Sequence, residues 1–309
     1  MPRLIDPGPV PGPIGLDRAV EALVAMRFDS EDDEAWDAAA PILAALSADR
    51  RFLGDIAVAA LIRGDDTPGI YGPPVIMLHR GAGNWFLRAN LWPAEEDAVL
   101  RASGRRAFFY DLPHDHNFSF LTIGHHGPGY ESDHWEVAAA PLGVVGEAVG
   151  LRSMGRRRLG AGEMLLYRAH CDVHAQRPPQ AFSVTLNLVE ASGRAPWRNQ
   201  YRFDTAQGRI AGLLNVTAIE GLLPLAAHLG GGNGLDVLHH LAVRHPVDRI
   251  RFGAVRALAG AADTPDARRA IIEAAARRDD RFVSANAARA LEEEAANQRW
   301  AADRTGMGA

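Results

Sequence analysis

The sequence predicts an α+β fold: an antiparallel β-barrel at residues 73–204, between an N-terminal arm and helical region at 1–72 and a helical tail at 205–309. Three observations predict it. Apolar residues recur at helical spacing before residue 64, short apolar runs separated by Gly, Pro and Asp fill the middle, and Ala, Leu and Arg dominate the remainder. Short punctuated strands are typical of barrels and sandwiches, whereas recurrence every three or four residues indicates amphipathic helices.

The N-terminal region begins with residues 1–15, whose Pro and Gly content predicts an irregular arm. A small helical region follows and ends near Gly64. The residues that carry its helical periodicity are Ala19, Leu23, Met26, Trp36, Ile42, Leu43, Leu46, Ile56, Leu61 and Ile62.

The middle region contains the predicted strands. The last of them alternates, with Phe182, Val184, Leu186 and Leu188 on one face and polar residues on the other. The predicted strands are Val75–Leu78, Trp85–Trp92, Phe108–Tyr110, Phe118–Ile123, Trp135–Val137, Met164–Tyr167 and Phe182–Val189.

The tail is predicted to be helical near residues 208–229, 234–244, 249–260, 265–278 and 281–296. Within it, Ala254–Leu258 (AVRAL) is echoed by Ala287–Leu291 (AARAL), and each copy follows an Asp-Arg pair. The pattern resembles HEAT-type repeats, which stack pairs of helices into a solenoid. This resemblance implies an interaction surface on the tail, with a possible protein partner.

Composition excludes several classes of protein. The net charge is −5, from 33 Lys and Arg against 38 Asp and Glu, which argues against a general nucleic-acid binder. Cys171 is the only cysteine, so no disulfide framework forms within the chain. No apolar run reaches the ~18 residues of a membrane span, and the first residues lack the apolar core of a signal peptide. We therefore expect a cytoplasmic protein without a membrane partner; the oligomeric state is open.

The chemistry is concentrated in the histidines. His114 and His116 are two residues apart, so on an extended chain their imidazoles share a face while Asp115 points away. His174 offers a third imidazole from a later strand. Neutral imidazole is the commonest metal ligand, and three ligands leave coordination positions open for chemistry. His170 competes with His174 as the third ligand, and Glu131 is an alternative carboxylate ligand.

The motifs around these histidines resemble the cupin superfamily, whose fold is a double-stranded β-helix, and within it the cysteine dioxygenase-like group. This resemblance covers about residues 110–190 and implies that His114, His116 and His174 hold a mononuclear Fe(II). The motifs are His114-Asp115-His116, the turn Gly127-Pro128-Gly129, the segment Gly160–Tyr167, Asp172-Val173-His174, Pro178-Pro179 and the strand Ser183–Leu188.

Two departures from the family pattern qualify the resemblance. Where many cupins have a ligating Glu after the His pair, this chain has Ser119-Phe120-Leu121, which favours a three-His site. Where thiol dioxygenases have a catalytic His and Tyr, residues 185–189 read Thr-Leu-Asn-Leu-Val. The metal site is therefore expected to serve a substrate other than cysteine.

Three further residues are candidates for the catalytic pocket: Tyr167, Asn187 and Arg88, of which Arg88 suits a substrate carboxylate. Asp115 and Asp172 are candidates for fixing the imidazoles by accepting their second N–H.

The sequence thus predicts a non-heme iron oxygenase that acts with O₂ on a small molecule or on a peptide- or carrier-bound amino-acid-like substrate. The alternatives are a non-oxidative isomerase, lyase or hydrolase that uses Zn, Ni or Mn, and a non-enzymatic sensor with a HEAT interaction surface. Imidazole suits Zn, Cu, Fe and Ni alike, so the ligands alone do not separate these alternatives.

Overall fold

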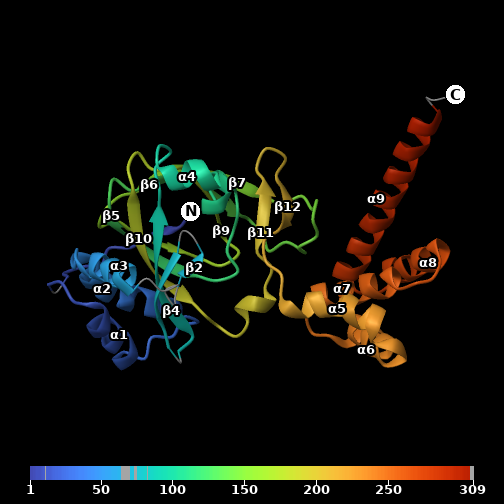
Figure 1. Cartoon of the computed structure of the whole chain (residues 1–309), viewed down its shortest axis with the longest axis horizontal. Coiled ribbons are helices and arrows are strands. Elements are labelled where there is room, and N and C mark those ends of the chain that lie inside the picture. The colour runs from blue at the N-terminus through green and yellow to red at the C-terminus, as the bar shows by residue number, and fades with distance from the viewer. Residues whose placement is uncertain (11, 64–69, 73–74, 82, 307–309) are drawn as a thin grey trace. The chain divides into compact units, whose positions relative to one another are not determined.

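The computed structural model describes residues 1–10, 12–63, 70–72, 75–81 and 83–306 (Figure 1). The chain divides into two compact units. The first consists of Met1–Ala140 and Ala148–Ala211 and contains the N-terminal helices and almost all of the β-structure. The second consists of Pro141–Glu147 and Gly212–Ala309 and is helical.

The first unit begins with three helices: α1 (Leu16–Ala25), α2 (Asp33–Ala48) and α3 (Phe52–Arg63). Helix α2 starts where the side chain of Asp32 accepts a hydrogen bond from the backbone N–H of Glu34, which satisfies one of the free donors of the first turn. The short helix α4 (Ala98–Ser103) and the 3₁₀ turns Arg105–Phe108 and Ala195–Trp197 lie later in this unit.

A seven-stranded antiparallel sheet forms the centre of the unit, with strand β10 (Ser183–Glu190) between β5 (Phe120–His126) and β4 (Trp85–Trp92). Its remaining strands are β1 (Arg3–Leu4), β8 (Met164–Tyr167), β3 (Val75–Arg80) and β2 (Ile70–Gly72), in the order β1-β8-β5-β10-β4-β3-β2.

A second sheet has three strands in the order β7-β6-β9: β7 (Leu151–Leu159), β6 (Tyr130–Val137) and β9 (Asp172–Gln176). Strands β11 (Tyr201–Asp204) and β12 (Arg209–Leu213) form a separate pair. The antiparallel β-architecture matches the prediction, but the described strands form separate sheets and not one closed barrel.

Two predicted elements were wrong. Phe108–Tyr110 is not a strand: it completes the 3₁₀ turn, and Phe109 and Asp111 adopt left-handed backbone with φ of 58° and 55° that no strand accommodates. The tail does not begin with a helix at 208: β12 occupies Arg209–Leu213, and the first helix starts only after Thr217.

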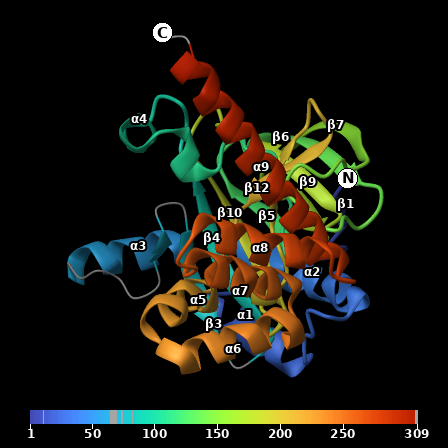
Figure 2. The ribbon, with the colours of Figure 1, turned by 90° about the vertical axis from the view of Figure 1, so that its right-hand side faces the viewer.

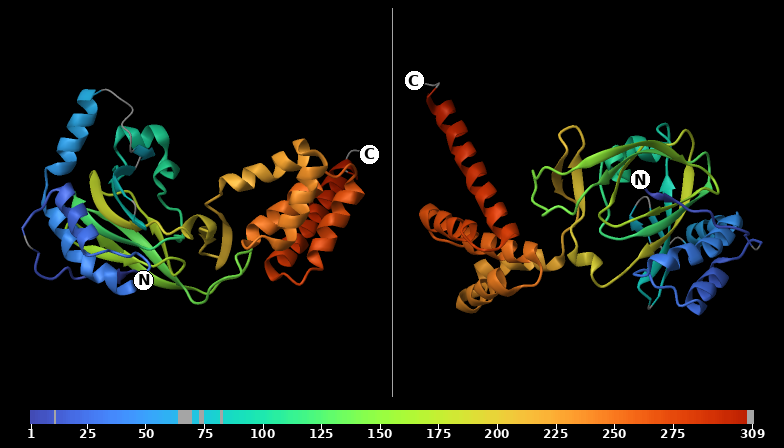
Figure 3. Two further views of the ribbon diagram at one scale, coloured as in Figure 1. Left: turned by 90° about the horizontal axis from the view of Figure 1, so that it is seen from below. Right: turned by 180° about the vertical axis from the view of Figure 1, so that it is seen from behind.

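The core of the first unit is divided by the seven-stranded sheet. On one face, Val184, Leu186 and Leu188 of β10 pack with Leu43 and Leu46 of helix α2, which lies against this sheet (Figure 3). On the other face Thr185, Asn187 and Val189 point away from the helices, because successive strand residues alternate. Phe182, predicted to join the apolar face, lies before the strand and is 44% exposed.

The second unit comprises α5 (Ala218–Leu229), α6 (Gly231–Arg244), α7 (Asp248–Gly260), α8 (Pro265–Ala276) and α9 (Arg281–Gly306), whose neighbours along the chain pack together (Figure 2). A capping box between Thr217 and Glu220 starts α5. The two predicted repeat copies fall in α7 and α9, where Ala254 and Ala287 are fully buried in one core with Leu238. No helix in the described ranges has the length and hydropathy needed to cross a bilayer.

Candidate metal centre

The site is assembled where the segment before β5 pairs with strand β9. The backbones of His114 and His174 form an antiparallel bridge, with N–H···O distances of 3.0 Å and 2.9 Å in the two directions. Farther along, the N–H of Asp111 donates to the carbonyl of Gln176 at 2.8 Å. This register places the side chains of His114 and His174 next to each other on one face.

Three imidazoles converge at this point. One ring nitrogen from each of His114, His116 and His174 lies within 4.8 Å of the other two, and the Nε2 atoms of His116 and His174 are 3.0 Å apart. The side chains are buried, with exposed fractions of 2%, 9% and 1%. The three histidines singled out in the sequence therefore come together in the fold.

The histidines are held in the neutral form that a metal requires. Burial lowers the pKa of His114, and burial followed by the charges of neighbouring groups holds the pKa of His116 and His174 well below the ordinary value. The Nδ1 of His114 lies 2.7 Å from the carbonyl oxygen of Leu112. Since a carbonyl only accepts, Nδ1 carries the proton, and the lone pair of His114 is on Nε2.

The two flanking carboxylates do not hold the imidazoles, contrary to the sequence-based expectation. One oxygen of Asp115 accepts from the backbone N–H of Tyr201 at 2.6 Å, and Asp172 binds Arg168 at 2.8 Å. The partner of His114 is a backbone carbonyl instead, which fixes its tautomer equally well.

The two alternative ligands lie outside the cluster. His170 has left-handed backbone with φ of 59°, and its Nδ1 is 3.5 Å from a carboxylate oxygen of Asp115. Glu131 is exposed on β6, and its Oε2 atom lies 3.8 Å from Nη1 of Arg156. The cluster therefore contains neither of them.

Tyr167 lies directly against the cluster. Its ring is 4.6 Å from that of His174 and stacks on Phe120 with an interplanar angle of 4°. Its hydroxyl is 3.0 Å from Nε2 of His134, a buried histidine on β6 that is the cross-strand partner of His174. Burial raises the pKa of Tyr167 well above its ordinary value, so the phenol is a neutral hydrogen-bonding group.

Arg88 and Asn187 lie opposite each other on β4 and β10, and Thr122 on β5 completes this row. The guanidinium of Arg88 lies 5.9 Å and 5.8 Å from the ring centroids of Phe86 and Phe118. Its positive charge also contributes to lowering the pKa of His116. The row therefore belongs to the face of the seven-stranded sheet on the side of the histidines.

Sequence reasoning missed two residues of the site, His134 and Gln176. The amide nitrogen of Gln176 is 3.2 Å from Nε2 of His174. Both residues follow from alternation along β6 and β9, because Ser132 and His134, and likewise His174 and Gln176, share a face. Glutamine is an uncommon metal ligand, so no ligand pattern in the sequence singles out Gln176.

Several buried polar atoms around this centre have no hydrogen-bond partner among the described residues. They include Thr122 Oγ1, His134 Nδ1, His174 Nδ1 and Gln176 Oε1. Since buried polar atoms are rarely left unpaired, their concentration here indicates a site that receives a polar ligand or ordered water.

Phe109 lies beside the site and has a strained backbone conformation. Its ring is 5.7 Å from that of His114, yet the residue is 44% exposed and has left-handed backbone. We expect Phe109→Gly to raise the free energy of unfolding by about 0.5–1 kcal/mol in urea titrations, because glycine removes the strain.

The matched control is Arg27→Gly, which changes another exposed residue with a φ of 54°. It should raise the stability by a similar amount. A loss of stability in Phe109→Gly alone would mean that the ring makes a larger stabilising contact than its exposure indicates.

Acid should destabilise the metal-free protein. Burial is the main cause that lowers the pKa of His134 to about 4, whereas the unfolded chain has the ordinary value of about 6.5. Between these pH values the unfolded state binds more protons, so the free energy of unfolding falls as the pH drops. Urea titrations should show a shallower fall for His134→Gln, which does not titrate there; equal slopes would refute this assignment.

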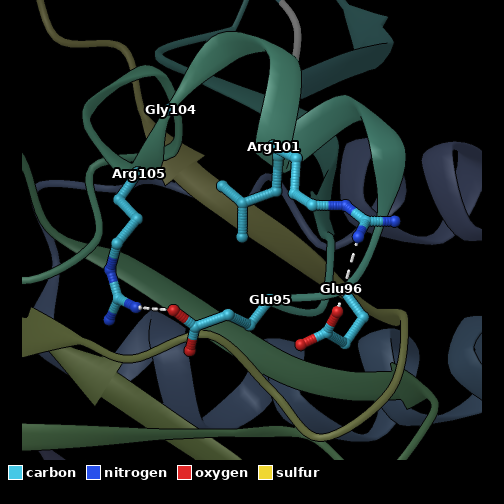
Figure 4. A pocket seen from close by; sticks show the side chains of 6 residues that line it. Glu95, Glu96, Arg101, Gly104 and Arg105 are labelled. Carbon is cyan, nitrogen blue, oxygen red and sulfur yellow. Dashed lines mark hydrogen bonds and ion pairs between the residues drawn. The ribbon is translucent and has the colours of Figure 1, made fainter.

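A surface hollow of about 250 Å³ lies beside α4, separate from the cluster (Figure 4). Its charged side chains pair with one another: Arg105 with Glu95 at 2.5 Å, and Arg101 with Glu96 at 3.6 Å. The pairing neutralises the hollow, and no candidate site residue from the sequence lines it.

Comparisons with known proteins give little further information. No family model matches the sequence. No curated protein matches it either.

Three solved structures illustrate the structural matches. Hydroquinone 1,2-dioxygenase PnpCD in complex with Cd²⁺ and 4-hydroxybenzonitrile has 11% identity and a TM-score of 0.25, over 38% of this chain and 63% of that chain. DMSP lyase DddQ from Ruegeria pomeroyi DSS-3 has 16% identity and a TM-score of 0.25, over 61% of this chain and 77% of that chain. The vicilin from Solanum melongena has 12% identity and a TM-score of 0.20, over 40% of this chain and 32% of that chain.

The match thus spans less than two thirds of the dioxygenase chain. At these TM-scores the likenesses carry no argument, and the function is argued from the site itself.

Proposed function

We propose that the chain is a cytoplasmic non-heme iron oxygenase of the cupin type, in which His114, His116 and His174 hold Fe(II). The observation that carries the proposal is the convergence of three buried imidazole nitrogens within 4.8 Å. A three-nitrogen site leaves positions open for O₂ and for a substrate, which is the arrangement that metal-dependent oxygenases use.

The alternative explanation for the cluster is a structural hydrogen bond between His116 and His174. That bond uses one donor and one acceptor and joins only two of the three rings. It gives the Nε2 lone pair of His114 no role. A shared cation accounts for all three rings, because each neutral imidazole then contributes one lone pair.

The substrate of the proposed enzyme is a small molecule, or a peptide- or carrier-bound amino acid, with a carboxylate. Arg88 supplies the positive charge that binds the carboxylate, and Asn187 lies opposite it with an amide that hydrogen-bonds the same group. His134 holds the phenol of Tyr167 by a hydrogen bond, which keeps the phenol ring against the ring of His174. Because the phenol is neutral, Tyr167 adds no charge to the site. The metal would supply Lewis acidity and bring O₂ and substrate together.

The remaining parts of the chain have supporting roles in this proposal. Residues 73–204 supply the cupin-type sheets that carry the site, residues 1–72 form the N-terminal arm and helical region, and residues 205–309 contain a HEAT-like stack that binds a protein partner. Support for the partner comes from helix α5, where Leu222, Leu225 and Leu229 are at least half exposed, at 57%, 52% and 77%. Apolar side chains at this spacing form one stripe of a helix.

A non-oxidative cupin that uses Zn, Ni or Mn is the second candidate. It is favoured by β10, where Asn187 and Val189 stand in place of the catalytic His and Tyr of the thiol dioxygenases. Imidazole ligands accept these metals as readily as iron.

Oxygen uptake by the Fe(II)-loaded protein separates the two candidates. A panel of amino acids, N-acylated amino acids and short peptides should contain a compound that stimulates uptake, and Arg88→Met should abolish the stimulation while still binding iron. Arg158→Met, which changes an exposed arginine of β7, serves as the control. Turnover of a substrate by the Zn-loaded protein without O₂ would support the non-oxidative candidate.

A further inference from the structure

The residue beside the histidines that no ligand pattern predicts is Gln176. It lies two residues after His174 on β9, so both side chains project from the same face of the strand. Gln176 is 5% exposed, and its backbone carbonyl accepts the N–H of Asp111. The position of the side chain is therefore fixed by the same strand pairing that brings His114 to His174.

The amide of Gln176 lies within contact distance of the atoms that would bind a metal. Its nitrogen is 3.2 Å from Nε2 of His174, which is itself 3.0 Å from Nε2 of His116. In this arrangement the amide N–H donates to the lone pair of His174. The amide oxygen is buried and has no hydrogen-bond partner among the described residues.

We propose that the amide oxygen of Gln176 is the fourth protein ligand of the metal held by the three histidines; this rests on the metal site proposed above. A cation takes the lone pair of His174, so the amide N–H loses its acceptor. Turning the amide about its last bond exchanges nitrogen and oxygen while the heavy-atom positions stay nearly the same. The oxygen then faces the cation, which is its strongest available partner.

A neutral oxygen ligand has chemical consequences that distinguish it from a glutamate. The site gains a donor of the kind that Mn and other hard divalent ions accept, without a negative charge. The full charge of the cation is then retained to attract an anionic substrate.

The test is Co(II) binding to the metal-free full-length protein, followed by the cobalt absorption spectrum and by the dissociation constant. Gln176→Glu should tighten binding and Gln176→Leu should weaken it, each by about tenfold or more. Gln176→Leu should also change the intensity and position of the cobalt bands, because the number of donors changes. Gln176→Asn, whose side chain is one carbon shorter, should also weaken binding. This variant keeps a polar side chain and provides the test if the leucine variant does not fold.

Gln180→Leu is the matched control. It makes the same change at an exposed glutamine that is not part of the cluster. This variant should bind Co(II) within about twofold of the wild type, with the same spectrum, because no ligand or ligand partner is altered. If folded Gln176 variants match the wild type in affinity and spectrum, the fourth-ligand proposal is overturned and the three-His site stands. If the wild-type protein itself binds no Co(II), both proposals fail together.

Discussion

The variant His114→Ala/His116→Ala should lose its bound metal. Wild-type protein expressed and purified without oxygen should contain about one metal ion per chain, and the double variant close to none. The reason is geometric: only His174 of the three converging imidazoles remains, and a single imidazole does not compete with water for the ion. Elemental analysis of both proteins measures the difference.

A second double variant controls for loss of histidine in general. His239→Ala/His240→Ala removes two exposed histidines of helix α6 and should leave the metal content unchanged. Retention of metal by the His114/His116 variant, or its loss from the α6 variant, would contradict the assignment of the site.

Asp115→Ala should destabilise the fold and weaken metal binding together. The carboxylate is 1% exposed and accepts the backbone N–H of Tyr201 at 2.6 Å, which holds strand β11 to the histidine segment. Removing it leaves a buried N–H without its acceptor, so we expect a loss of about 2–3 kcal/mol in the free energy of unfolding. Metal affinity should fall about 10- to 100-fold, because the backbone between the two histidines is released.

The matched variant is Asp115→Asn, which keeps an oxygen that accepts the N–H of Tyr201. It should lose less than half as much stability as the alanine variant in the same urea titrations. If both variants lose the same amount, the charge of Asp115, and not its hydrogen bond to Tyr201, holds the segment.

The sequence identified the three histidines for a reason that the structure makes clear. Residues i and i+2 share a face in any extended segment, so the spacing of His114 and His116 predicts that their imidazoles lie together. His174 required a second argument, the family resemblance, because nothing local relates it to position 114. Its backbone bridge to His114 is a long-range contact that only the assembled sheets create.

Other features were missed because they depend on contacts across the sheets. His134 is the cross-strand partner of His174 and reaches Tyr167 from β6, a pairing that requires the register of three strands. Strand β7 was not predicted, because its Arg-rich and largely exposed residues lack apolar alternation. The strand predicted at Phe108–Tyr110 is wrong for the opposite reason. The segment is apolar, but Phe108 and Tyr110 reach the hydrophobic core from a tight turn and not from a strand.

The most direct test of the account is a crystal structure of the metal-loaded protein, with the ion located by its anomalous scattering. The account predicts one strong peak among the ring nitrogens of His114, His116 and His174. Absence of a peak there, with the ion bound elsewhere or not at all, would contradict the metal site on which the proposed function depends.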